Sequence, residues 1–227
     1  MPLAIITGAS RGLGLALARA LAERHWALVI DARGARDLER VARELGSLTE
    51  VAALPGDVAD PAHRRALVHA AGDTIDLLVN NASVLGPSPQ PALADYPLDR
   101  LSRVYAVNVL APLALAQLAL PRMPEGARII NVTSDAAVEP YEGWGGYGSS
   151  KAALEQVSAI LAAEQPSLRV YTVDPGDMRT RMHQEAFPGE DISDRPPPEE
   201  SVPGLLALIE GELPSGRYRA REVGVPV

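Results

Sequence analysis

The sequence predicts a doubly wound α/β domain, and three observations support this prediction. Short apolar runs alternate along the chain with longer amphipathic segments, as expected when crossover helices join the strands of a parallel sheet. A glycine-rich turn separates the first apolar run from the first amphipathic segment. The 227 residues show no internal repeat and no dividing linker, and this length suits one domain. We therefore expect a single domain over 1–227, with a central parallel sheet of about seven strands and helices on both faces.

The expected strands are short apolar runs, the pattern of strands that are buried on both faces of a sheet. The first reads Leu-Ala-Ile-Ile-Thr and the fourth reads Ile-Asp-Leu-Leu-Val. The strands are expected at residues 3–7, 27–31, 51–54, 75–79, 128–132 and 168–173, with a final short strand at 217–220.

The segments between these runs carry apolar residues at helical spacing. In the second segment Leu38, Val41 and Leu45 mark the inner face, because residues three and four apart share one side of a helix. Proline and acidic residues are frequent from 187 to 203, which indicates a loop or lid. Helices are expected at residues 12–23, around 38–45, and at 61–71, 98–120, 147–164 and 205–210.

Composition and charge narrow the possible functions. A net charge of −8 and a pI near 5.0 argue against nucleic acid as a partner, because phosphates need a basic surface. The chain has no cysteine, and therefore no disulfide, thiolate metal site or thiol nucleophile. Its four histidines show no metal-ligand spacing and are expected on the surface or in the core, so we expect no metal.

Nothing in the sequence predicts a membrane partner. The longest apolar run, residues 109–121, is too short to span a bilayer and is interrupted by Pro112. The N-terminus reads as structure from Leu3 onward, without the pattern of a signal peptide. We therefore expect a cytoplasmic protein.

Lys151 is the one lysine of the chain, and it stands four residues after Tyr147. On a helix this spacing points both side chains at the same space. A free phenol has a pKa near ~10, and a neighbouring ammonium favours the phenolate, so we expect a Tyr147 pKa closer to neutral. Such a phenol is a general acid suited to neutral pH. The alternative is that arginine-rich codon usage left a single lysine by chance.

The turn after the first expected strand is rich in glycine. Gly8, Gly12 and Gly14 form a Gly-x-x-x-Gly-x-Gly pattern, which permits a tight turn and a close approach of the backbone to a diphosphate at a helix N-terminus. By itself the pattern also fits a simple turn. Its place directly after the first strand favours a cofactor site.

These motifs together resemble the short-chain dehydrogenase/reductase family over nearly the whole chain. Ser134 precedes Tyr147 by thirteen residues, a separation typical of that family. The resemblance implies a Rossmann fold and an NAD(P)-dependent oxidoreductase that interconverts a carbonyl and a secondary alcohol. The matching elements follow the family's order: the turn at 7–14, Asp57-Val58, Asn80-Asn81-Ala82, Asn108, Ser134, Tyr147, Lys151, Pro175-Gly176 and Thr180.

The resemblance assigns catalytic roles to four residues. Tyr147 would exchange a proton with the substrate oxygen, and Ser134 would hydrogen-bond and orient that oxygen. Lys151 would lower the tyrosine pKa and bind the nicotinamide ribose. Asn108 would help to hold a water molecule that continues the proton path to solvent. The redox chemistry itself belongs to the cofactor.

The resemblance also predicts the residues that bind the cofactor. Asp57 would bind the adenine amino group, Asn80 would lie along the adenosine ribose, and Thr180 would bind the nicotinamide carboxamide. The full predicted set is Gly8, Ser10, Arg11, Gly12, Leu13, Gly14, Arg33, Asp57, Val58, Asn80, Ala82, Tyr147, Lys151, Pro175, Gly176 and Thr180.

The sequence gives conflicting signals on the choice of cofactor. An acidic residue at the end of the second strand normally accepts from the ribose 2′-hydroxyl of NAD and repels the 2′-phosphate of NADP. The family's NAD-selecting aspartate aligns with Ala32, so Asp31 is expected to point away from the ribose. Arg33 and Arg11 occupy positions where NADP-preferring relatives carry basic residues. We therefore expect NADP(H) to be favoured over NAD(H); the alternative is that both arginines are solvated surface residues.

Three features depart from the family pattern. Ser83 replaces the glycine that follows Asn80-Asn81-Ala82 in the family. Asp174 stands before Pro175 where asparagine or a small residue is common. The C-terminus lacks the family's Asp-Gly-Gly ending.

The resemblance places a substrate lid at about 181–203. Trp144 and Met182 are expected in the substrate pocket, although Trp144 could equally be a packing residue. Together with Phe187 of the lid, Met182 favours bulky neutral carbonyls over anionic ones. The counter-argument rests on three side chains that could receive a carboxylate: Arg179, Arg181 and His183.

By the same resemblance, the long helix and the Tyr147 helix form a subunit interface. We therefore expect a homodimer or homotetramer closed by two-fold axes. The apolar residues expected at this interface are Ala106, Leu110, Leu113, Leu118, Ala152, Val157 and Leu161.

Two other functions fit part of the pattern. A non-catalytic dinucleotide-binding sensor or scaffold would carry a damaged catalytic set, whereas this set is intact. An epimerase or dehydratase that uses the same cofactor usually has a larger substrate domain.

Overall fold

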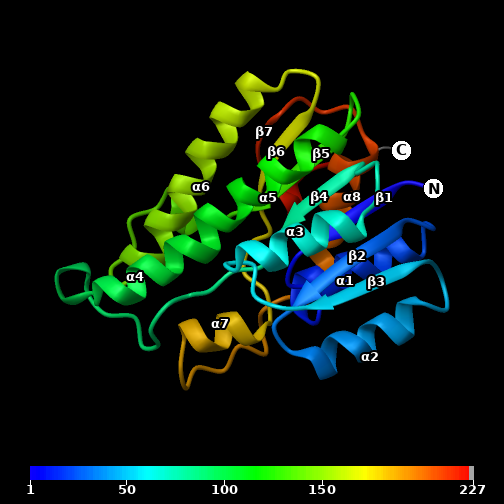
Figure 1. Ribbon diagram of the computed structural model, residues 1–227. Coiled ribbons are helices and arrows are strands. Elements are labelled where there is room, and N and C mark those ends of the chain that lie inside the picture. The colour runs from blue at the N-terminus through cyan, green and yellow to red at the C-terminus, as the bar shows by residue number, and fades with distance from the viewer. Residues whose placement is uncertain (225–227) are drawn as a thin grey trace.

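The computed structural model describes residues 1–224, which form an α/β domain around a seven-stranded sheet (Figure 1). The strands run parallel in the order β3-β2-β1-β4-β5-β6-β7. The predicted end of the domain at Val227 lies outside the described residues. The strands are β1 (Leu3–Ile6), β2 (Ala27–Ala32), β3 (Val51–Pro55), β4 (Leu77–Asn80), β5 (Arg128–Val132), β6 (Arg169–Asp174) and β7 (Gly216–Arg219).

Helices cover both faces of this sheet, as the sequence predicts. One face is covered by α1, α2 and α8, and the other by α3, α5 and α6. The helices are α1 (Gly12–Ala22), α2 (Ala35–Leu45), α3 (Pro61–Ala70), α4 (Leu98–Tyr105), α5 (Ala111–Ala119), α6 (Gly145–Glu164), α7 (Arg181–Ala186) and α8 (Val202–Glu210).

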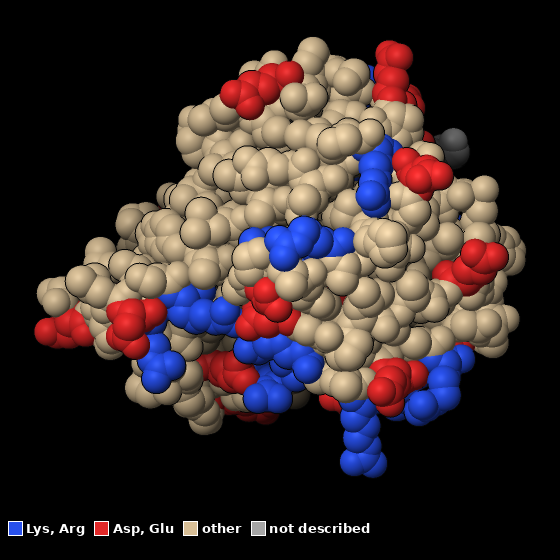
Figure 2. Space-filling model, in the orientation of Figure 1, with Lys and Arg blue, Asp and Glu red and all other residues tan. Residues whose placement is uncertain are grey.

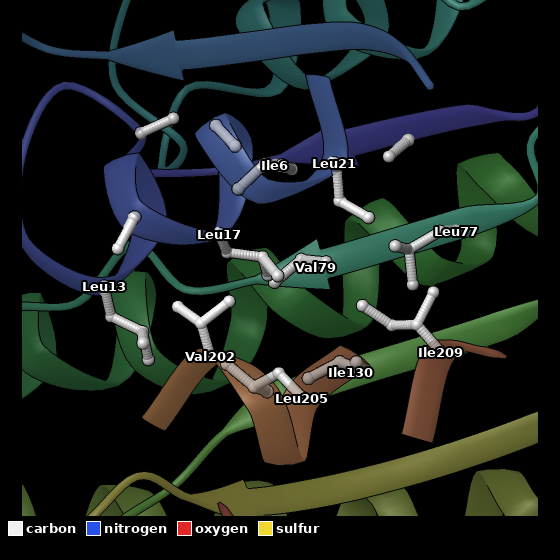
Figure 3. Packing of buried hydrophobic residues seen from close by; sticks show 14 of the residues in the cluster. Ile6, Leu13, Leu17, Leu21, Leu77, Val79, Ile130, Val202, Leu205 and Ile209 are labelled. Carbon is white, nitrogen blue, oxygen red and sulfur yellow. The ribbon is translucent and has the colours of Figure 1, made fainter. Parts of the chain in front are cut away.

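Each face of the sheet has its own hydrophobic core. On the first face Leu17 of α1 and Leu205 of α8 meet beside Val79 and Ile130 of the sheet (Figure 3). Each of these side chains is almost fully buried, which contributes about 1.5–3 kcal/mol per residue. The core of the opposite face includes Ile5, Leu67, Leu115, Ile129 and Leu161.

The strand order reverses at the centre of the sheet. β1 pairs with β2 on one side and with β4 on the other. After β1 the chain enters α1 on one face of the sheet. The helix α5, which follows β4, packs on the other face. The turns after β1 and β4 therefore separate and open a crevice at the carboxyl ends of the strands, where doubly wound domains bind their ligands.

The predicted long helix is interrupted near its middle. Between α4 and α5 the chain forms a π-helical turn, η2 (Ala106–Leu110), in which the Ala111 N–H donates to the Ala106 carbonyl. Pro112 follows in the first turn of α5. Proline has no N–H, so the Asn108 carbonyl lacks its α-helical partner. Interruptions of this kind often occur at functional sites.

The segment Leu98–Arg122, which contains this interruption, is also long and apolar enough to cross a membrane, with a mean hydropathy of 1.6 over its most apolar window. Half of that window is buried within the domain. Leu115 and Ala119 of α5, for example, belong to the core beneath α3. Its apolar residues thus serve the core of the domain.

Several boundaries differ from the prediction by one to three residues, and two differences have local detail. Ile75 precedes β4 and does not open it, because its backbone N–H donates to the Arg122 carbonyl at 2.9 Å. The start of the predicted lid is helical: residues 181–186 form α7, and the Thr180 hydroxyl at its N-cap accepts from the His183 N–H at 3.2 Å. The predicted fold class is confirmed.

Of the seven residues predicted for a subunit interface, six are exposed or partly buried and one is buried. Leu110 is 59% exposed, and five others are partly buried. Leu161 was wrongly assigned, because its side chain belongs to the core between α6 and the sheet. Figure 2 shows few charged side chains over α5 and α6, whereas acidic and basic residues mix around α2 and α7. A dimer or tetramer stays a prediction.

Packing of α8 yields a test of the fold. A Cβ added at Gly204 would lie 1.7 Å from the Ala220 carbonyl oxygen, whereas one added at Gly216 would make an ordinary contact of 3.7 Å with Tyr218. Alanine favours a helix over glycine, but this clash with backbone cannot relax cheaply. We expect Gly204→Ala to lower the free energy of unfolding by about 3 kcal/mol in chemical denaturation, and Gly216→Ala to change it by less than about 0.5 kcal/mol. Equal effects would contradict this packing.

Candidate active site

One continuous cleft of about 1140 Å³ lies along the carboxyl ends of the strands. It runs from Arg33 and Asp37, beyond β2, past the glycine-rich turn to Tyr147 of α6. The predicted site residues that line it are Gly8, Ser10, Arg11, Gly12, Leu13, Arg33, Asp57, Val58, Ala82, Ser134, Trp144, Tyr147, Lys151, Pro175, Gly176, Thr180 and Met182. Gly14, Asn80 and Asn108 lie behind its walls.

The glycine-rich turn packs directly on the turn after β4. Gly8 has a φ of +70°, a left-handed conformation that favours glycine, and a Cβ there would lie 2.9 Å from the Ala82 Cα. A Cβ at Gly14 would lie 2.6 Å from the Gly8 carbonyl oxygen. Gly14 thus shapes the turn from behind and does not line the cleft.

Thr7 and Asn81 hold these two turns together. The Thr7 hydroxyl accepts from the backbone N–H groups of Asn81 and Ala82, each at 3.0 Å. The Asn81 side-chain amide donates to the carbonyls of Thr7 at 2.8 Å and Gly8 at 3.2 Å. Asn81 also lines the cleft, a contribution that the sequence analysis missed.

The prediction that Asn80 lies along the cofactor ribose was wrong. Asn80 is the last residue of β4 and is 4% exposed. Its amide donates to Asn131 Oδ1 at 2.8 Å, and the Asn131 amide donates to the Ser158 hydroxyl at 2.7 Å. Because side chains alternate along a strand, Asn80 faces α6 and not the cleft.

Tyr147 and Lys151 share the buried face of α6, as their spacing predicts. The Lys151 ammonium nitrogen lies 5.4 Å from the centre of the Tyr147 ring and donates to the Val132 carbonyl at 2.8 Å. Ser134, two residues beyond β5, donates its hydroxyl to Asp135 Oδ1 at 2.9 Å, and its hydroxyl also lowers the pKa of Tyr147. The structure therefore brings the predicted serine, tyrosine and lysine together.

The expected lowering of the Tyr147 pKa is not found. Burial raises the pKa of this phenol well above its usual value, and the Asp174 carboxylate raises it further, while the hydroxyl groups of Ser83 and Ser134 oppose the shift. Burial also lowers the pKa of Lys151 to about 8. The ammonium that was expected to favour the phenolate is itself costly to keep charged in the interior.

Asn108 supports the site from the π-helical turn. Its side-chain oxygen accepts from the Ser83 hydroxyl and the Val84 N–H, each at 3.0 Å. Its amide donates to the Val84 carbonyl and the Ser150 hydroxyl, also at 3.0 Å. Ser83, where the family has glycine, thus hydrogen-bonds Asn108, and its hydroxyl opposes the rise of the Tyr147 pKa. The departure from the family pattern did not predict this role.

Asp174, the second departure, has a structural partner in β7. Its Oδ1 accepts from the Gly176 N–H at 2.9 Å, and its Oδ2 lies 3.4 Å from the Arg217 guanidinium. Arg217 also pairs with Glu155 at 3.0 Å. Burial nevertheless raises the pKa of Asp174, against the opposing effect of the Gly176 N–H and Arg217.

The end of the cleft near Arg33 is rich in charge. Asp31 is buried below the glycine-rich turn, and both of its carboxylate oxygens are engaged: Oδ1 accepts from the Gly8 N–H at 2.7 Å, and Oδ2 pairs with His63 Nε2 at 3.0 Å. Asp31 therefore faces this turn, although it also borders the cleft. The partnership with His63 joins residues 32 apart in the sequence and was not predicted.

Asp57 borders the same end of the cleft and pairs with Arg103 of α4. Burial opposes its ionisation, but the Ala59 N–H and the Arg103 guanidinium hold the pKa of this carboxyl below its usual value. Arg11 and Arg33 are exposed at the cleft edge.

The opposite end of the cleft is aromatic. Between ring centres, Trp144 packs edge-on against Tyr147 at 5.9 Å and, at a tilt, against Phe187 of the predicted lid at 5.8 Å. Met182 packs against the same cluster. Trp144 therefore both packs and lines the cleft, so the two readings of this residue are not exclusive.

The three basic side chains of the lid region already have partners. Arg181 pairs with Glu185 at 2.7 Å, and Arg179 donates to the Ser193 carbonyl at 3.3 Å. His183 Nδ1 lies 3.7 Å from Asp177. Within residues 1–224, no group of three or more histidine, aspartate and glutamate side chains is arranged to hold a metal ion.

Comparison with known proteins agrees with this arrangement. The sequence matches the short chain dehydrogenase family over residues 2–191. It is 32% identical over 197 residues to the sepiapterin reductase of Meriones unguiculatus, which covers 79% of this chain and 75% of that protein. The family resemblance seen in the motifs is therefore confirmed.

Solved structures give the same result. A short chain dehydrogenase from Pseudomonas syringae superposes with a TM-score of 0.90 at 28% identity, covering 96% of this chain and 94% of that chain. An alcohol dehydrogenase from the archaeon Thermococcus sibiricus, solved with 5-hydroxy-NADP, superposes with a TM-score of 0.86 at 27% identity, covering 96% of this chain and 95% of that chain.

Proposed function

We propose that this chain, which belongs to the short-chain dehydrogenase family of oxidoreductases, interconverts a carbonyl and a secondary alcohol with NADP(H). The observation that carries the proposal is one cleft that joins two chemically different ends. Tyr147, Ser134 and Lys151 lie at one end, and Arg33 lies at the other beyond the glycine-rich turn. Such a cleft can hold a dinucleotide and a small substrate side by side.

The residues of the cleft suit a bound dinucleotide. The N-terminus of α1 opens into the cleft, and Arg11 at its N-cap makes no side-chain cap hydrogen bond. The N–H groups of the first turn of α1 are therefore left to a diphosphate. When bound, NADPH supplies the hydride.

Tyr147 is the proton donor in the proposed reduction. Because burial raises the pKa of this phenol, it is protonated at neutral pH and donates to the carbonyl oxygen as the neighbouring carbon gains the hydride. Ser134 would turn its hydroxyl from Asp135 to the same oxygen. Lys151 would stabilise the phenolate that remains, and the carbonyl of Asn108, which has no donor at Pro112, would hold a water molecule for reprotonation.

The preference for NADP(H) rests on the charge around β2. Arg33 and Arg11 border the cleft with exposed guanidinium groups, which suit a phosphate. Asp31 is held toward the glycine-rich turn by the Gly8 N–H and toward α3 by His63, which disfavours a hydrogen bond to a ribose hydroxyl. The relative solved with 5-hydroxy-NADP supports the same choice.

The substrate end of the cleft favours bulky neutral carbonyls. Trp144, Phe187 and Met182 form an aromatic and apolar wall, and we propose that the segment at 181–203 acts as the lid over the substrate. Asp135 and Asp177 also line the cleft and would repel an anionic substrate. The arginines of the lid region are engaged elsewhere.

Replacing Tyr147 tests the proposed chemistry. We expect Tyr147→Phe to retain NADPH binding and to lower kcat at least about a hundredfold, because general acid catalysis is lost. Tyr96→Phe is the matched control, since the buried Tyr96 hydroxyl has no hydrogen-bond partner among residues 1–224. Steady-state kinetics and fluorescence titration measure the two quantities. Wild-type kcat in Tyr147→Phe would refute the mechanism.

Replacing Arg33 tests the choice of cofactor. We expect Arg33→Ala to weaken NADPH binding roughly tenfold to a hundredfold, as expected for lost charged hydrogen bonds, while NADH binding stays the same. Arg36→Ala removes a neighbouring exposed arginine of α2 and should change neither affinity. Calorimetric titrations give both values. Unchanged NADPH affinity in Arg33→Ala, or tighter NADH binding by the wild type, contradicts the preference.

A substrate panel tests the proposed specificity. Aryl ketones, bulky aldehydes and keto acids would be compared by the rate of NADPH depletion. We expect kcat/KM for neutral aryl carbonyls to exceed that for keto acids at least about tenfold, which is the scale of a single unfavourable charge contact. Preference for keto acids would overturn the substrate class. NADPH binding without turnover of any class would favour a non-catalytic sensor.

A further inference from the structure

An acidic residue is buried at the end of β2 where the cleft needs positive charge. Asp31 is 1% exposed and stands two residues before Arg33. Both residues border the same end of the cleft. An uncompensated carboxylate here would repel a phosphate bound at Arg33, because charges that are partly buried are screened less than charges in water.

The fold places His63 against this carboxylate. His63 lies in the first turn of α3, where Asp60 caps the helix through the Ala62 N–H and Pro61 opens it. Its Nε2 lies 3.0 Å from Asp31 Oδ2, and the side chains of His63 and Asp31 are 8% and 2% exposed.

A glycine gives the imidazole its room. A Cβ at Gly56 would lie 2.2 Å from His63 Nδ1, so any larger residue at the end of β3 would displace the ring. The histidine and aspartate are 32 residues apart in sequence and meet only because β2 and β3 are neighbours in the sheet.

The two donors on Asp31 have separate tasks. The Gly8 N–H ties Oδ1 to the glycine-rich turn at 2.7 Å, which an asparagine oxygen could also do. His63 engages Oδ2 at 3.0 Å. Of the two donors, only His63 is a side chain, so only this contact can be removed by substitution.

We propose that His63 is a specificity-determining residue that favours NADP(H). By engaging Asp31, it keeps this carboxylate from repelling the 2′-phosphate of the cofactor. The inference rests on the proposed NADP(H)-dependent function. His63 acts through Asp31, and Arg33 remains the residue that contacts the phosphate.

The test compares the two cofactors in a double-mutant cycle. Affinities for NADPH and NADH would be measured by fluorescence titration for the wild type, His63→Leu, Asp31→Asn and the double variant. We expect His63→Leu to weaken NADPH binding about tenfold more than NADH binding, because only NADPH carries the added phosphate. In the Asp31→Asn background, His63→Leu should change the ratio of the two affinities less than about twofold. His69→Leu, in the same helix and exposed, is the control and should leave both affinities unchanged.

Each outcome decides between specificity and structure. Equal losses for NADPH and NADH in His63→Leu would mean that the pair only shapes the turn, and would overturn the inference, as would no loss at all. If His63→Leu does not fold because it leaves a buried charge unpaired, the double variant still decides. It should keep the wild-type ratio of affinities, and a shift of about tenfold toward NADH would show that His63 acts independently of Asp31. A wild-type protein that binds no NADPH would instead refute the proposed function.

Discussion

The contact between the turn after β1 and the turn after β4 is the constraint on which the rest of the site depends. The Thr7 hydroxyl and the Asn81 amide join these turns, and Gly8 and Gly14 leave no side chain between them. Because these two side chains bond directly to backbone groups, they hold the two turns in contact at the mouth of the crevice. The positions of the α1 N-terminus on one side and of the π-helical turn on the other follow from it. A bulkier turn would separate the two halves of the sheet and with them the two ends of the cleft.

Burial governs the chemistry at the other end. Tyr147 and Lys151 are held by α6 in a place where charging either group is unfavourable. A protein that only needed stability would put apolar residues of similar size there. Their neighbours instead provide hydroxyl and amide groups, from Ser83, Ser134 and Asn108, which satisfy polar atoms without adding charge. The hydroxyl and amide groups around Tyr147 are thus neutral, whereas the carboxylates of Asp174 and Asp135 raise its pKa.

Much of this arrangement follows from local sequence. The strands, the glycine-rich turn and the shared helix face of Tyr147 and Lys151 depend on neighbours within a few residues, so their patterns are visible in the chain. Asn80 was misplaced because neighbouring strand residues face opposite ways, and the motif alone did not say which asparagine faced the cleft. The partnership of Asp31 with His63 could not be predicted, since it depends on the pairing of β2 with β3. The direction of the Tyr147 pKa depends on how deeply two side chains are buried, which only the packed helix determines.

Pro112 has a consequence that reaches beyond helix geometry. A residue with an N–H at this position would complete a regular helix and, judged by α5 alone, would make the protein more stable. Its N–H would also donate to the Asn108 carbonyl, for which Pro112 supplies no donor. Selection for stability therefore favours replacing Pro112, whereas selection for catalytic rate favours keeping it. We therefore expect that variants selected for higher thermal stability would often replace Pro112 and would have a lower catalytic rate.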